Sequence, residues 1–128
     1  MFTKALITAA IAVPLIAVSA VAQQSANKRT PLQTVDFPAG YNVISVIAEL
    51  HDGCVGRHTH PGVEDTYVME GEGILKVDGQ PDRTVKAGDS FQVPPGVPHD
   101  ACVAKGQSYK VLATFIVEKG KPVASPAP

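Results

Sequence analysis

Turn-forming residues divide most of this chain into runs that are too short for long helices. Glycine and proline, often next to aspartate, interrupt the sequence repeatedly after residue 40. The runs between them, such as Tyr41–Leu50 and Ser108–Glu118, are rich in valine and isoleucine and show no sustained 3.6-residue period with caps. Some eight short strands separated by turns are typical of a β-sandwich or β-barrel. The sequence therefore predicts one all-β domain.

The clearest local prediction is a β-hairpin. Ile74–Val77 and Arg83–Lys86 flank Asp78 and Gly79, a pair that supplies the positive φ of a tight turn. Further short strands are expected at Ser90–Val93 and on either side of other glycines, with turns at the glycines themselves.

The first 22 residues have the pattern of a separate segment. Lys4 precedes an apolar run, and Ala20, Val21 and Ala22 supply the small-x-small pattern of a cleavage site, so the sequence predicts a secretory signal peptide cut after Ala22. A membrane anchor is the alternative, but the run is shorter than the roughly 20 apolar residues that a bilayer span needs. The mature protein is expected to be periplasmic or secreted.

The rest of the chain divides into three parts. Residues 23–36 are an N-terminal lead-in, residues 37–118 carry the domain, and residues 119–128 are a tail rich in proline and alanine without a core pattern. The formal net charge of -1 gives no electrostatic reason to expect nucleic acid as a partner, or a membrane after cleavage. The sequence leaves open whether two copies form a homodimer.

The placement of three histidines and one glutamate predicts a metal site. His58 and His60 are two residues apart, so in a strand they face the same side. Glu64 follows a Pro-Gly turn and can face the same interior, and His99 is the fourth candidate because it follows the rigid corner Pro94–Pro98. Buried charges are costly unless they are paired or bind a metal. The alternatives are histidines that only form hydrogen bonds in a core and a polar surface patch.

Two motifs in the sequence resemble those of small single-domain cupins of the quercetin-dioxygenase-like kind. The first cupin motif is a glycine, His-x-His, a glutamate and a second glycine. His58, His60, Glu64 and Gly71 match it, whereas Gly53 lies four residues before the first histidine instead of five.

In the second motif Gly88, Pro94, Gly96 and His99 match, and Val103 stands where the motif has asparagine. The resemblance covers most of the mature chain. It implies an all-β cupin jelly-roll barrel that binds one divalent first-row transition metal, and it leaves the choice among Fe, Mn, Zn, Cu and Ni open. The ligands that it implies are His58, His60, Glu64 and His99.

Two functions are compatible with such a site. Three nitrogens and one carboxylate leave open positions on a metal, which favours a small metalloenzyme, dioxygenase-like, that acts on a small organic ligand. Strand alternation places Thr66, Val68, Ala101 and Val103 along the cavity, with no second acid or base among them. This wall favours the alternative, a protein that binds a small molecule or a metal without turnover. The enzyme is the preferred hypothesis.

Cys54 and Cys102 each flank a segment with metal ligands, and an exported protein can form disulfides. In the resembled fold their strands are antiparallel neighbours, so the two cysteines can pair. Strand alternation opposes this, because Cys54 lies four residues before His58 and Cys102 three after His99. A disulfide therefore requires a bulge or a similar irregularity, and two small buried hydrophobic residues are the alternative.

Overall fold

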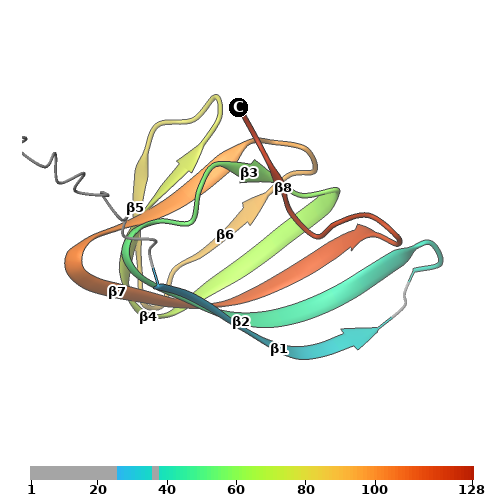
Figure 1. The fold of residues 1–128 in the computed structure, drawn as a ribbon, viewed down its shortest axis with the longest axis horizontal. Helices are drawn as coiled ribbons and strands as arrows, with labels where there is room; N and C mark the ends of the chain where they lie inside the picture. The colour runs from blue at the N-terminus through green and yellow to red at the C-terminus, as the bar shows by residue number, and fades with distance from the viewer. Residues whose placement is uncertain (1–25, 36–37) are drawn as a thin grey trace, which may run out of the picture.

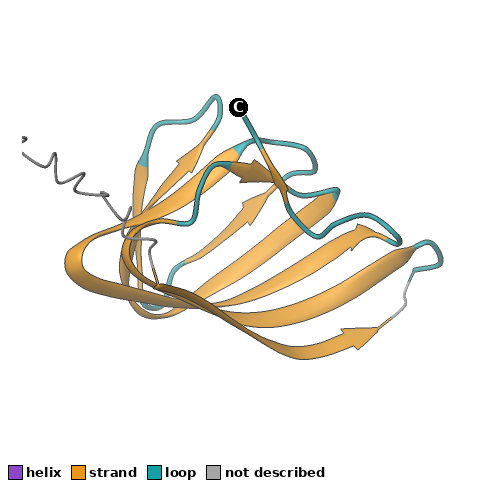
Figure 2. Cartoon of the chain, viewed as in Figure 1, coloured by secondary structure: helices purple, strands orange, loops and turns teal. Residues whose placement is uncertain are grey.

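The computed structural model describes residues 26–35 and 38–128. Within these ranges the chain folds into a single antiparallel sheet that curls around one of its faces (Figure 1). Strands and loops account for all of the described residues, without a helix (Figure 2), so the prediction of an all-β fold is confirmed. The predicted signal peptide lies outside the described residues.

Among the described strands β4 and β7 are the longest, and most of the other strands pair with one of these two. The strands are β1 Ala26–Val35, β2 Tyr41–Cys54, β3 His58–Thr59, β4 Gly62–Val77, β5 Arg83–Lys86, β6 Ser90–Val93, β7 His99–Glu118 and β8 Ser125–Pro126. β7 pairs with β2 and with β4, β1 pairs with β2, and both β5 and β6 pair with β4. The predicted hairpin is present as β4 and β5, with Ile74 opposite Thr84 and Leu75 opposite Arg83.

β4 and β7 continue through positions where the sequence predicts turns. Around Gly71 the register between the two strands shifts, so the strands bend together instead of ending. Gly71 has φ 74°, and a Cβ there would lie 2.0 Å from the carbonyl oxygen of Ser108. Glycine is thus required for the close approach of β4 to β7, and it does not end the strand.

β1 occupies part of the segment that the sequence predicts to be a loose lead-in. It pairs with β2 as an edge strand, and its register shifts between Pro31 and Gln33, next to a residue that lacks a backbone N–H. Leu32 and Val35 are more than half exposed. This strand is held by backbone pairing more than by burial, which explains why it has no hydrophobic pattern.

The core lies on the enclosed face of the curled sheet. Phe91 is buried there, whereas Tyr67 and Met69 lie on the outer face and are 50% and 41% exposed. The described residues include no helix that is long and apolar enough to cross a membrane. Buried side chains of the core cluster come from β2, β4, β5, β6 and β7 and include Leu50, Val68, Leu75, Val85, Val93 and Val111.

Candidate metal centre

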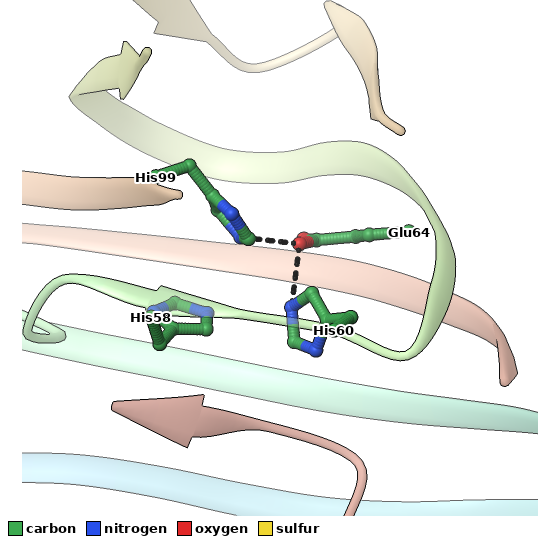
Figure 3. A group of neighbouring side chains, drawn as sticks. All are labelled: His58, His60, Glu64 and His99. Carbon is green, nitrogen blue, oxygen red and sulfur yellow. Dashed lines mark hydrogen bonds and ion pairs between the residues drawn. The ribbon is translucent and has the colours of Figure 1, made fainter. Parts of the chain in front are cut away.

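The structure brings the four predicted ligands together at one end of the enclosed face. β3 pairs with β7 so that His58 lies opposite His99. His60 follows β3 directly, and Glu64 is near the start of β4. One ligand-capable atom from each residue lies within 4.8 Å of those of the other three, and Figure 3 shows His60 and His99 meeting at Glu64.

Glu64 lies at the centre of the cluster and contacts two of its three histidines. Its Oε2 lies 3.1 Å from Nε2 of His60 and 3.0 Å from Nε2 of His99. Thr66, which the sequence suggests as a cavity-lining residue, donates a hydrogen bond of 2.7 Å to Oε1 instead. Only 8% of Glu64 and 3% of each of these two histidines are exposed. The carboxylate is therefore fixed from three directions with little access to water.

The charges of the cluster depend on one another. Burial alone raises the pKa of Glu64, but hydrogen bonds from His60, His99 and Thr66 outweigh it and hold that pKa well below its usual range. Burial lowers the pKa of His99, but the hydrogen bonds with Glu64 and Val97 and the negative charges of Glu64 and Asp100 together outweigh it, so the net shift is upward. For His58 burial prevails and the pKa falls. Glu64 is therefore ionised, and His99 readily holds a proton that a metal ion would replace.

All three imidazoles use Nδ1 in the same way. Nδ1 lies 2.7 Å from the carbonyl oxygen of Gly56 in His58 and 3.0 Å from that of Val97 in His99. In His60 the partner is the carbonyl of Val123, at 2.6 Å. A carbonyl only accepts hydrogen bonds, so each Nδ1 carries the proton. This fixes the orientation of each ring, and once its Nε2 carries no proton that atom is the candidate ligand.

The donor set fits a single divalent transition-metal ion. Three imidazole nitrogens and one carboxylate suit Fe, Mn, Zn, Cu or Ni, and four protein ligands leave positions free in a larger coordination shell. Within the described residues one further group of ligand types is formed by Cys54, Asp100 and Cys102. Its two cysteines are joined in a disulfide, so they are not thiolate ligands. His51 is exposed and lies outside both groups.

The candidate centre opens into a cavity of about 270 Å³. Its wall is mostly apolar, as the sequence predicts, but different residues form it. Of the expected residues Ala101 lines the cavity, whereas Val68 and Val103 belong to the packed core. The apolar wall is contributed by β2, β4, β6 and β7 through Val46, Leu75, Phe91, Val111, Ala113 and Phe115.

Tyr109 is a functional candidate that the sequence did not reveal. It lines the cavity and is 5% exposed, and its hydroxyl has no hydrogen-bond partner among the described residues. Burial, with a further contribution from Glu64, raises the pKa of this phenol, so it stays a neutral donor. Tyr109 alternates with Val111 and Ala113 in β7, and in such a run a tyrosine is expected to be an ordinary core residue.

Cys54 and Cys102 form a disulfide and lie directly opposite each other in β2 and β7. The conflict in strand alternation is resolved by the irregular stretch between Cys54 and His58. Gly56 has φ 100° there, and the stretch lies outside any strand. The two cysteines consequently lie on the face opposite to the metal ligands' side of β7, while His58 and His99 still meet.

The fold and the cluster place this protein in the double-stranded β-helix class, curled antiparallel sheets with ligand side chains on the inner face. The family model described as the cupin domain matches residues 47–117, which is more than half of the chain. The chain therefore belongs to the cupin family. A search of curated protein sequences finds no match.

Solved structures similar to this one include proteins with and without a named activity. A cupin superfamily protein from Desulfitobacterium hafniense is 18% identical, with a TM-score of 0.61 over 72% of this chain and 78% of that chain. The DMSP lyase DddQ from Ruegeria pomeroyi is 18% identical, with a TM-score of 0.68 over 79% of this chain and 51% of the lyase. An oxalate oxidase in complex with glycolate is 22% identical, with a TM-score of 0.61 over 78% of this chain and 54% of the oxidase. At these identities the likeness concerns the fold.

Proposed function

We propose that this protein is an exported metalloenzyme that binds one divalent first-row transition metal through His58, His60, Glu64 and His99 and converts a small, largely apolar organic molecule. The observation that supports this most directly is the position of the ligand cluster, buried yet open to an apolar cavity. Two structural neighbours are named as a lyase and an oxidase, which favours an enzyme. An oxygenase-like reaction is the specific form that we propose.

The residues of the chain have separate parts in this function. A bound metal ion would polarise a coordinated group of the substrate or support electron transfer. The apolar wall would exclude water and hold the hydrocarbon part of the substrate. Tyr109 is the one buried cavity-lining hydroxyl without a partner among the described residues, and it would donate a hydrogen bond to a polar group of the substrate and so orient it.

Metal content tests the centre. Replacing His60 with alanine removes one of the four ligands, and we expect metal occupancy, measured by plasma mass spectrometry, to fall sharply while the β-fold persists. His51→Ala is the matched control, because His51 is exposed and outside the cluster, and it should retain full occupancy. Equal occupancy in wild type and His60→Ala would refute the centre.

Turnover separates the enzyme from the alternative, a protein that binds a small molecule or a metal without converting it. The apolar wall without a second acid or base is the observation that favours this alternative. Metal-loaded protein should consume oxygen or convert a member of a panel of small phenolic and keto compounds. Metal binding without any such turnover would favour the binding protein.

Export is proposed from the leader pattern of residues 1–22, and the disulfide is compatible with an oxidising compartment. We expect the exported protein to begin at Gln23 when its intact mass is measured. A soluble exported form that still carries Met1 would contradict this proposal.

A further inference from the structure

The end of the described chain is docked against the metal-ligand strand. Residues 121–128, which we call the strap, follow β7 and contain β8. β8 pairs with β3, so that Ser125 lies opposite Thr59 and Pro126 opposite His58. Figure 1 shows this last segment crossing beside β3. A region whose sequence shows no core pattern is thus placed next to two metal ligands.

Two contacts hold the end of the strap. The backbone N–H of Ala127 donates a hydrogen bond of 3.0 Å to the carbonyl of Arg57. The Nε of Arg57 donates one of 2.5 Å to the carbonyl of Pro128. The same guanidinium binds both carboxylate oxygens of Asp78, at 2.5 Å each, and this bidentate pair fixes its orientation. Arg57 therefore connects the strap to the turn after β4.

The strap reaches the candidate centre through one backbone atom. The carbonyl of Val123 accepts the hydrogen bond from Nδ1 of His60 at 2.6 Å. In His58 and His99 the corresponding carbonyl lies only two residues earlier in the chain, whereas Val123 is 63 residues away from His60. His60 is thus the one histidine of the cluster whose ring orientation depends on a distant segment. Val123 also lines the cavity.

We propose that the strap is a positioning element for the metal centre. It fixes the ring and tautomer of His60 through the carbonyl of Val123 and completes the cavity wall at this end. Without the strap, Nδ1 of a ring that is 3% exposed loses the only acceptor that the described residues give it. The ring would then sample other orientations, and loss of such an outer hydrogen bond typically weakens metal affinity about 10- to 100-fold.

The test releases the strap without touching a metal ligand. The full-length double variant Arg57→Ala, Ala127→Pro removes the guanidinium contacts and the N–H of residue 127. The matched control Lys76→Ala, Ala127→Ser removes an exposed cation of β4 and keeps both contacts to the strap. Three quantities are compared: backbone hydrogen exchange at residues 57–59 and 123–125, the imidazole nitrogen NMR signals of the metal-free protein, and the affinity for Zn²⁺ by chelator competition.

We expect the double variant to exchange faster in both segments, to change the Nδ1 signal of His60 but not those of His58 and His99, and to bind Zn²⁺ about 10- to 100-fold more weakly. The control should resemble wild type. An unchanged His60 signal and Zn²⁺ affinity in a released strap would overturn the proposal. Equal changes in all three histidines would overturn it too, because the strap would then support the fold in general. A strap that stays protected in the double variant would also count against the proposal, because Arg57 and Ala127 are the contacts that place its end beside the histidines.

This inference rests on the proposed metal centre only for the Zn²⁺ measurement. If wild-type protein binds no Zn²⁺ or other divalent ion, the proposed function fails. The exchange and imidazole signals of the metal-free protein still decide whether the strap positions His60.

Discussion

At the scale of single residues, two buried hydroxyls on the enclosed face differ in whether they have a hydrogen-bond partner. The hydroxyl of Thr66 is satisfied by Glu64, whereas that of Tyr109 is buried without a partner among the described residues. A buried donor that is left unpaired destabilises a protein by about 1 to 3 kcal/mol. Such a group is retained more readily where it serves a ligand than where it serves stability.

Tyr109→Phe removes this hydroxyl and keeps the ring. We therefore expect the free energy of unfolding, measured with urea on metal-free protein, to stay the same or to rise by about 1 kcal/mol. Tyr67→Phe is the control, because Tyr67 is half exposed on the outer face and should show no change. A loss of stability in Tyr109→Phe would mean that the hydroxyl has a partner in the folded protein, and its proposed role toward a ligand would lose its basis.

The cluster of candidate metal ligands could be predicted from the sequence because the sequence signals for it are local. His58 and His60 are spaced for one strand face, and the two cupin motifs place Glu64 and His99. Tyr109 could not be found in this way, because a tyrosine among alternating apolar residues is typical of a core. Whether its hydroxyl has a partner depends on the packing of distant strands, which spacing does not reveal.

At the scale of elements, strands with a side-chain pattern could be predicted from the sequence, whereas strands held mainly by backbone pairing could not. The hairpin of β4 and β5 was predictable because turn residues and strand residues agree there. β1 and β8 were not, because their mostly exposed side chains leave no alternating pattern. The continuity of β4 through Gly71 was missed for another reason: a glycine that permits close approach looks, in a sequence, like a glycine that ends a strand.

The disulfide joins β2 to β7, and its contribution to the free energy of unfolding can be estimated from the length of the loop that it closes. It joins cysteines 48 residues apart, and the chain-entropy model gives about 4 kcal/mol for a loop of this length. We expect the double variant Cys54→Ser, Cys102→Ser to lose about this much unfolding free energy in urea. Reduced wild-type protein is the control and should lose a similar amount. A loss well below 1 kcal/mol would show that the loop is already constrained without the bond.

At the scale of the whole molecule, the centre exists because one sheet curls until segments far apart in the chain converge. β3, β4 and β7 supply the ligands, and the strap supplies the carbonyl for His60. The protonation of this candidate centre would consequently link the stability of the entire fold to metal binding, because His99 donates a hydrogen bond to Glu64 and would have to lose that proton to bind a metal ion.

Above pH 6.5 the effect of pH on the free energy of unfolding has a definite direction. The folded-state pKa of His99 lies above its ordinary value of 6.5, so its contribution to stability is complete below 6.5 and is lost as the pH rises through the folded-state pKa. His58 has a lowered pKa, so it is neutral in the folded state throughout this range and becomes neutral in the unfolded state as the pH rises past 6.5, which opposes the His99 trend only near pH 6.5. Glu64, whose pKa is lowered, contributes fully there and loses its contribution only as the pH falls below about 4.5.

We therefore expect opposite trends from pH 6.5 to about pH 9 in the same protein. The unfolding free energy of the metal-free form, measured in urea, should decrease with rising pH, while the affinity for Zn²⁺ should increase because fewer protons compete for His99. His51→Ala should show both trends, since His51 is exposed and outside the cluster. If both quantities rose together across this range, His99 would not be protonated by its contact with Glu64, and the coupling between fold and centre would have to arise from another group.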